Sequence, residues 1–202
     1  MTTIREKMKN GMLYVDIGEG LDEERQQCKE LCFDYNNTRP TDLKTRETIL
    51  KQLLGSAGEN IWFEPPIHMA YGKHVHIGND FYANFNLTLV DDGEIFIGNN
   101  VMIAPNVTIT PTGHPIRPDL RLKGTQFSIP VKIGNNVWIG CNVVILPGIT
   151  IGDNSVIGAG SVVTHDIPEN VVAFGNPCRV IRKINDHDQE FYFKNRKIEG
   201  NI

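Results

Sequence analysis

The sequence predicts a mainly-β solenoid built from a six-residue repeat, and three observations lead to this prediction. Aliphatic residues recur at a step of six, at Ile97, Ile103 and Ile109 and again at Ile133, Ile139, Ile145, Ile151, Ile157 and Val163. A glycine or alanine often follows each of them, and a valine often stands two places before. The third observation is that a period of six excludes an α-helix. A helix turns every ~3.6 residues, so positions six apart lie on different faces.

A repeat of six residues is typical of a unit that consists of one short strand and one turn, with the aliphatic side chain pointing inward. Three such flat faces close one triangular coil of about eighteen residues, and each coil buries its aliphatic side chains on the next. A rougher series at Ile77, Ala83 and Leu89 loses its frame near residues 91–93. We therefore expect the solenoid over residues 61–184, interrupted by a protruding loop at about 111–129, where "TPTGHPIRPD" breaks the repeat.

Residues 1–60 read as a small helical segment. Thr3 and Glu6 form a capping box that opens the first helix. In the next two helices the apolar residues fall on one face each, with Gly55 as a C-cap. These residues are Cys28, Leu31, Cys32 and Tyr35 in the second helix and Leu43, Leu50, Leu53 and Leu54 in the third. The tail, residues 185–202, is compatible with a last helix or with an extended arm.

Composition excludes several classes of function. The chain has 20 basic and 24 acidic residues, a net charge of −4, which gives no electrostatic case for nucleic acid or an anionic membrane. No apolar run approaches the ~18 residues of a membrane span, and the N-terminus has no apolar signal region. Four scattered cysteines are too few for a disulfide framework. We expect a soluble cytoplasmic protein with reduced thiols.

Several stretches resemble the galactoside and maltose O-acetyltransferases, a family of hexapeptide-repeat acyltransferases. They are "KMKNGMLYVD", "FYANFNLTLVDD", "APNVTITPTGHP", "IGNNVWIGCNVVILPGITIGDNSVIGAGSVVT" and "GNPCRVIRKI". The resemblance implies a left-handed parallel β-helix and a homotrimer with active sites between subunits. It also implies transfer of an acetyl group from acetyl-CoA to a hydroxyl of a galactoside or related pyranoside, without a metal.

The resemblance assigns two catalytic residues. His114, in "TGHP", matches the family's general base, and a histidine can accept a proton near neutral pH and return it to a leaving thiolate. Asn84 matches an asparagine whose amide helps to stabilise the oxyanion and contacts both substrates. An asparagine could instead serve a ladder or turn in the coil, and a lone loop histidine carries no such role without the family motif.

Further positions match the acceptor side of the site. Asp92 matches a carboxylate that accepts sugar hydroxyls, although an acid beside Asp91 and Gly93 could simply be a solvated turn residue. Asp16 matches another acceptor contact, and Trp138 matches an aromatic lining residue. Ala70 departs from the family, because the galactoside branch has serine there and the maltose branch aspartate. A site that lacks this polar contact discriminates differently between acceptors.

The residues that match the coenzyme side follow the late coils. The resemblance places backbone contacts along the pantetheine arm and basic residues near the nucleotide phosphates, which arginine suits through its charge and forked donors. The full set is Asn84, Cys141, Ala159, Thr164, His165, Arg179 and Arg182. Cys141 replaces a serine of the galactoside branch, and its backbone N–H can still serve the thioester. The two arginines could instead belong to a solvated basic tail.

Other hypotheses stay open beside the sugar acetyltransferase. A metalloenzyme on the same coil, like the γ-type carbonic anhydrases, would use His74 and His76. Cys28 and Cys32, four residues apart, could also hold a metal, although a buried helix face is typical of such spacing. A hexapeptide acetyltransferase for a non-sugar acceptor, such as a xenobiotic, shares much of the repeat. A non-catalytic trimeric scaffold would keep the fold alone.

Overall fold

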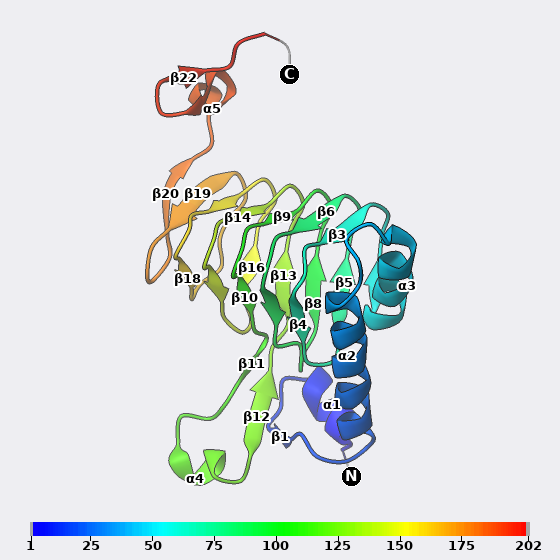
Figure 1. The fold of residues 1–202 in the computed structure, drawn as a ribbon. Coiled ribbons are helices and arrows are strands. Elements are labelled where there is room, and N and C mark those ends of the chain that lie inside the picture. The colour runs from blue at the N-terminus through cyan, green and yellow to red at the C-terminus, as the bar shows by residue number, and fades with distance from the viewer. Residues whose placement is uncertain (1, 201–202) are drawn as a thin grey trace.

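The computed structural model describes residues 2–200 and confirms a parallel β-helix with small N-terminal helices (Figure 1). Its coils have three flat faces. Face 1 consists of β2 (Ser56–Ala57), β5 (Val75–Ile77), β8 (Ile95–Ile97), β13 (Val131–Ile133) and β16 (Thr150–Ile151). Face 2 consists of β3 (Ile61–Phe63), β6 (Phe81–Ala83), β9 (Met102–Ile103), β14 (Trp138–Ile139), β17 (Val156–Ile157) and β19 (Val171–Phe174). Face 3 consists of β4 (Ile67–Met69), β7 (Leu87–Leu89), β10 (Thr108–Ile109), β15 (Val144–Ile145) and β18 (Val162–Val163).

The strand register explains why the six-residue repeat is regular late in the chain and irregular early in the chain. Trp138 pairs with Val156, one coil of 18 residues later. Ile61 pairs with Phe81 at a spacing of 20, because the early coils have a longer turn between faces 3 and 1. The β2 strand pairs with β5, so coil pairing already begins at Ser56. The frame slip near residues 91–93 is one of these longer turns.

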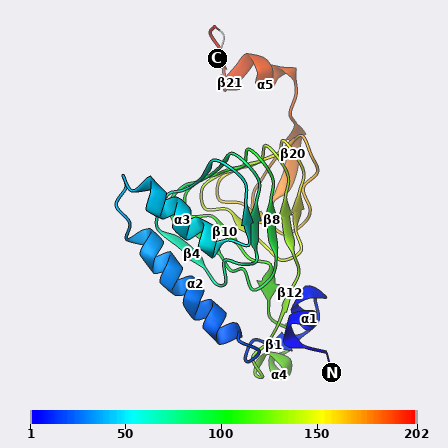
Figure 2. The same cartoon turned by 90° about the vertical axis from the view of Figure 1, so that its right-hand side faces the viewer.

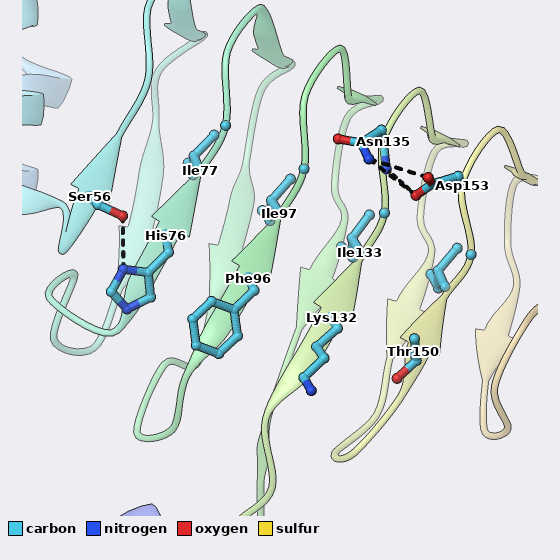
Figure 3. A pocket seen from close by; sticks show the side chains of 15 residues that line it. Ser56, His76, Ile77, Phe96, Ile97, Lys132, Ile133, Asn135, Thr150 and Asp153 are labelled. Atoms are coloured by element: carbon cyan, nitrogen blue, oxygen red, sulfur yellow. Dashed lines mark hydrogen bonds between the residues drawn. The ribbon is translucent and has the colours of Figure 1, made fainter.

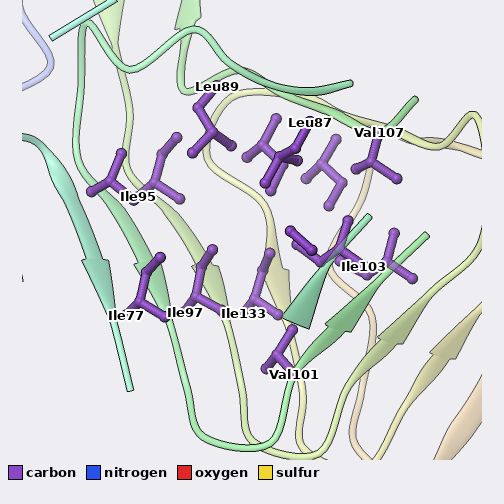
Figure 4. Close-up of a cluster of buried hydrophobic side chains, with 14 of the residues drawn as sticks. Ile77, Leu87, Leu89, Ile95, Ile97, Val101, Ile103, Val107 and Ile133 are labelled. Carbon is purple, nitrogen blue, oxygen red and sulfur yellow. The ribbon is translucent and has the colours of Figure 1, made fainter. Parts of the chain in front are cut away.

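The core is the aliphatic column that the period predicts (Figure 4). All nine aliphatic residues of the two clean six-residue series are buried, and the valines two places before them, such as Val101 and Val137, are fully enclosed. Each side chain packs on its counterpart in the next coil, as Ile97 does on Ile133. Burial of this apolar area, at about 25 cal/mol per Å², is what stabilises a coil whose strands are only two or three residues long.

Asparagines turn the corner between faces 1 and 2. Asn100, Asn136 and Asn154 all have a positive φ near 60°, a left-handed conformation that asparagine adopts more easily than other non-glycine residues. Their side chains stack into a ladder, in which Asn100 donates to Asn136 at 3.0 Å and Asn136 donates to Asn154 at 2.8 Å. Gly134 precedes this corner because a Cβ there would lie 2.2 Å from Asp153 Oδ1 of the next coil.

Two N-terminal helices close the open end of the first coil (Figures 1 and 2). They are α2 (Leu21–Asn36) and α3 (Leu43–Leu53). Tyr35 donates its hydroxyl hydrogen to the Phe63 carbonyl at 2.7 Å, and Asn36 exchanges two hydrogen bonds with the backbone of Ile67. These contacts satisfy strand groups that have no earlier coil to pair with.

Two details of α3 differ from the prediction. Leu43 is the first residue of the helix and is 53% exposed, at a cavity of about 640 Å³ between α3 and the first coil. Gly55 is not a left-handed C-cap; α3 ends at Leu53, and its C-cap residue Leu54 is extended. The glycine is required for close packing instead, since a Cβ would lie 2.1 Å from the Lys73 carbonyl oxygen.

The loop that interrupts the coil is an ordered hairpin that the N-terminal segment pairs with. Its elements are β11 (Thr112–Gly113), α4 (Pro118–Arg121) and β12 (Thr125–Ser128). The β12 strand pairs antiparallel with β11 on one side and with β1 (Tyr14–Val15) on the other. The helix α1 (Ile4–Lys9), opened by the predicted Thr3–Glu6 capping box, lies beside this sheet (Figure 1).

The tail contains both a helix and strands. After β19 the chain turns back as β20 (Arg179–Lys183), then forms α5 (Asp186–Glu190), β21 (Phe191–Phe193) and β22 (Arg196–Lys197). Figures 1 and 2 show this segment extending beyond the last coil, at the opposite end from α2 and α3. No helix within residues 2–200 is both long and apolar enough to cross a membrane.

Candidate active site

Several of the predicted residues lie in turns at the corner between faces 3 and 1, the 3–1 corner. Ala70 and Asp92 lie in the turns after β4 and β7, and His114 lies in the loop that follows β10. Thr164 and His165 lie in the turn after β18, further along the same corner. The coil therefore stacks residues that are far apart in sequence, because each coil turns the same corner in the same register.

His114 is held with one ring nitrogen defined by its partner. Its Nδ1 lies 2.9 Å from the backbone carbonyl oxygen of Thr125, on the facing strand β12. A carbonyl oxygen can only accept, so Nδ1 carries the proton and Nε2 is the unprotonated acceptor of the neutral ring. The side chain is exposed in the single chain. This is the tautomer and the exposure that a general base acting on a bound hydroxyl needs.

Asp92 is not a solvated turn acid; it is only 9% exposed and belongs to a buried polar network. The Gln126 amide donates to Asp92 Oδ1 at 3.3 Å and to the Tyr14 hydroxyl at 3.0 Å. The Tyr14 hydroxyl lies 2.7 Å from the Ser128 hydroxyl. Burial raises the pKa of Asp92, and the nearby charge of Asp16 raises it further, while the Gln126 hydrogen bond lowers it.

Asp16 lies beside this network in a partly buried ion pair. Its carboxylate accepts hydrogen bonds from the Tyr71 hydroxyl at 2.7 Å and from the Arg25 guanidinium. Arg25 also bonds the Asp16 carbonyl and the Asp22 carboxylate. These contacts attach the N-terminal segment to the turn that carries Ala70. They give Asp16 a structural role in addition to its predicted contact with the acceptor.

Asp91 is a residue of this corner whose role the sequence reading missed. It is fully buried, and its carboxylate accepts three backbone N–H bonds, from Ala70 at 2.7 Å, Tyr71 at 3.1 Å and Gly72 at 2.6 Å. The sequence feature that marks Asp91 is the "DDG" triplet, but nothing in this triplet distinguishes a buried acid that holds a turn from a solvated pair of acids. Asp91 fixes the turn that carries Ala70, one coil before its own.

The remaining predicted residues lie at another corner, between faces 2 and 3, the 2–3 corner. Asn84, Cys141 and Ala159 occupy its turns after β6, β14 and β17. The Asn84 carboxamide oxygen accepts the Phe85 backbone N–H at 2.8 Å, so its amide hydrogens are directed elsewhere. Trp138 lies on outer face 2 beside this corner and is 51% exposed, in register with Met102 and Tyr82 on the preceding coils.

Arg179 and Arg182 lie on β20, which pairs with the last strand of face 2. Arg182 holds Asp188 of α5 through two hydrogen bonds of 2.6 Å, and this pairing lowers the pKa of Asp188 to about 2. Arg179 donates to the Cys178 carbonyl at 2.8 Å. Both side chains are exposed, and an anion that binds Arg182 shares or displaces Asp188.

The histidines of the metalloenzyme hypothesis have protein partners. His74 Nδ1 donates to the Asp91 carbonyl at 2.7 Å, and His76 bridges Glu94 at 2.7 Å and Ser56 at 3.0 Å. Within residues 2–200, no three side chains of histidine, cysteine, aspartate or glutamate are grouped closely enough to hold a metal ion. Cys28 and Cys32 are buried on α2, and burial together with the neighbouring thiol raises the pKa of Cys28.

Two hollows on the single chain lie near the coil corners but do not enclose this chemistry. One, of about 500 Å³, is a groove along outer face 1 that Ser56, His76, Phe96, Lys132 and Thr150 line in a row (Figure 3). Another, of about 430 Å³, lies between α1 and face 1 and touches Asp92. Neither is lined by His114 or Asn84. One copy of the chain thus divides the predicted residues between two separate corners.

Comparisons with known proteins define the class. Residues 7–58 match the maltose acetyltransferase hexapeptide capping motif, and residues 130–165 match six bacterial transferase hexapeptide repeats. The chain is 55% identical to galactoside O-acetyltransferase of Escherichia coli K12, over 98% of this chain and 97% of that protein. It is 50% identical to galactoside O-acetyltransferase of Lactococcus lactis, over 93% and 91% of the two chains.

Comparisons with solved structures indicate the same class. A galactoside acetyltransferase in complex with coenzyme A superposes with a TM-score of 0.96 at 55% identity, covering 98% of this chain and 99% of that one. A maltose O-acetyltransferase from Clostridium difficile 630 gives 0.89 at 53% identity, covering 91% and 98%. The coil and its helical cap are thus those of a hexapeptide-repeat acyltransferase. The chain belongs to the galactoside and maltose O-acetyltransferase family.

Proposed function

We propose that the protein transfers an acetyl group from acetyl-CoA to a hydroxyl of a galactoside or related pyranoside, with His114 as general base. The observation that carries this proposal is the His114–Thr125 hydrogen bond, which leaves Nε2 as a free acceptor on a rigid hairpin. The 55% identity to a galactoside acetyltransferase solved with coenzyme A supports the choice of both substrates.

The chemistry follows from these groups. His114 Nε2 removes the proton of the acceptor hydroxyl as its oxygen attacks the thioester carbonyl, and a C–O bond forms. The tetrahedral oxyanion accepts hydrogen bonds from the Asn84 amide and from the backbone N–H of Cys141, which stabilise it by ~2.7–4 kcal/mol per good donor. The C–S bond then breaks, and the proton passes from His114 to the thiolate of CoA. No acyl-enzyme is required, so Cys141 acts through its backbone only.

The acceptor side is the 3–1 corner. The Asp92 side chain, held by Gln126, accepts a hydrogen bond from a sugar hydroxyl, and Asp16 contributes beside it. Ala70 has no hydroxyl or carboxylate to offer, so the acceptor preference differs from that of relatives with serine or aspartate there. The coenzyme side follows Ala159, Thr164 and His165, with the arginines of β20 at the phosphates.

The two corners work together in a homotrimer. A second copy can bring its 2–3 corner, with Asn84 and Trp138, against the 3–1 corner of the first copy. Repeating this contact around a three-fold axis closes a ring with three equivalent sites. The exposed stripe of Tyr82, Met102 and Trp138 beside the 2–3 corner supports this arrangement, because contiguous exposed apolar side chains mark interfaces.

The test is CoA release from acetyl-CoA, measured by thiol detection across a panel of acceptors. The panel contains a galactoside, a thiogalactoside, maltose, glucose and a non-sugar xenobiotic. We expect turnover on at least one pyranoside. The order of the turnover rates across the acceptors reports the effect of Ala70. Turnover of the xenobiotic alone would replace the sugar acceptor by another class. Binding of CoA without turnover of any acceptor would support the scaffold hypothesis instead.

A further inference from the structure

We propose that Gln126 is a positioning residue for acceptor recognition, which fixes the Asp92 carboxylate in the site. The inference rests on the proposed function and deepens it, because it adds a residue that determines acceptor affinity. Gln126 lies on β12, in the interrupting loop, and is only 8% exposed. It lies 34 residues from Asp92 in sequence.

The hydrogen bonds determine which way the Gln126 amide points. An ionised carboxylate has no hydrogen to give, so the amide nitrogen must face Asp92 Oδ1. The same nitrogen donates to the Tyr14 hydroxyl, so both of its hydrogens are used. Tyr14 is 2% exposed and lies directly opposite Gln126 in the β1–β12 pairing. Gln126 is therefore fixed from one side by the N-terminal strand and holds Asp92 on the other.

This contact has a consequence for the acceptor. Gln126 engages Oδ1 of Asp92, so Oδ2 is the oxygen presented to a sugar hydroxyl. The hydrogen bond also opposes the burial that favours the protonated acid, and only the ionised carboxylate accepts at both oxygens. Ala70, on the preceding coil at the same corner, supplies no polar side chain. The affinity for the acceptor thus depends strongly on how Gln126 orients Asp92.

The same strand also orients the base. Thr125, next to Gln126, accepts the hydrogen bond from His114 Nδ1. Successive residues of β12 therefore set the position of the base and of the acceptor carboxylate. The two roles affect different kinetic constants. Loss of the Gln126 donor disturbs acceptor binding and therefore KM, while the Thr125 carbonyl still holds His114 and kcat is kept.

The test is a double-mutant cycle with Gln126→Met and Asp92→Ala, measured by CoA release. Methionine keeps the length of the side chain and removes the donor. We expect Gln126→Met to raise the KM for the best pyranoside roughly ten-fold, as the loss of a hydrogen bond to a charged group does, with kcat and the KM for acetyl-CoA within about two-fold. In the Asp92→Ala background, where no acceptor is left for the Gln126 amide, Gln126→Met should have no further effect on KM.

Two controls complete the experiment. Gln26→Met makes the same chemical change at an exposed position of α2 and should leave all constants unchanged. Gln126→Asn keeps an amide but is too short to bridge Tyr14 and Asp92, and should raise the KM as Gln126→Met does. An unchanged KM, or an equal rise in the Asp92→Ala background, would overturn the inference. A wild-type protein that turns over no pyranoside would instead overturn the proposed function, and this inference with it.

Discussion

Replacement of His114 by alanine is expected to lower kcat for acetyl transfer by about 10²–10⁴-fold, the usual contribution of a positioned general base. The KM for acetyl-CoA should stay near that of the wild type, because His114 is not among the predicted coenzyme contacts and its ring is bonded to Thr125 of the hairpin. The side chain is exposed, so the free energy of unfolding should hardly change. Steady-state CoA release and urea unfolding measure the two effects.

The matched control is His68→Ala, which removes an exposed histidine from the outer side of β4. It should leave kcat unchanged. Full activity of the His114→Ala protein would show that the base is another group, although the family and the coil would be unaffected.

Replacement of Asp91 by alanine is expected to lower the free energy of unfolding by about 3 kcal/mol or more. The backbone N–H groups of Ala70, Tyr71 and Gly72 would lose their acceptor. Those of Tyr71 and Gly72 are buried, and each buried unsatisfied donor costs about 1–3 kcal/mol. Part of this cost is offset because a buried carboxylate no longer has to be desolvated. Urea unfolding at neutral pH measures the difference.

Asp34→Ala provides the comparison, since it removes an exposed acid from α2 and should change stability by no more than about 0.5 kcal/mol. If Asp91→Ala unfolded at the same urea concentration as Asp34→Ala, the turn that carries Ala70 would be held by packing rather than by the carboxylate.

The coil could be predicted from the sequence because its signal is local and repeated. Each inward position, such as Ile139, is specified by neighbours within six residues, and the same pattern recurs in every coil. The capping box of α1 is local in the same sense. A residue such as Leu43 is different, since whether it is covered depends on how far the first coil extends beneath α3.

The polar framework of the site could not be predicted in this way. Tyr14 and Ser128 are 114 residues apart, and no period joins the N-terminal segment to the interrupting loop. Asp91 and Asp92 are adjacent in sequence and both buried, yet Asp91 fixes a turn and Asp92 joins Gln126. The "TGHP" motif points to His114, but only the hydrogen bond to the Thr125 carbonyl assigns the proton to Nδ1.

In the proposed homotrimer, the 3–1 corner of one copy and the 2–3 corner of another form one site. The direct measurement is the activity of mixed trimers of His114→Ala and Asn84→Ala chains, refolded together. Each variant alone should be nearly inactive. In a random equal mixture about one quarter of the interfaces combine an intact His114 with an intact Asn84, so about a quarter of wild-type activity should return.

A mixture of His114→Ala with Asp92→Asn serves as the control, because both changes damage the same 3–1 corner and no interface is restored. Recovery in the first mixture and not in the second is the result predicted here. Wild-type chains refolded in the same way must regain activity. If they do, and the first mixture is no more active than its components, His114 and Asn84 act within one copy and the two-corner site is wrong.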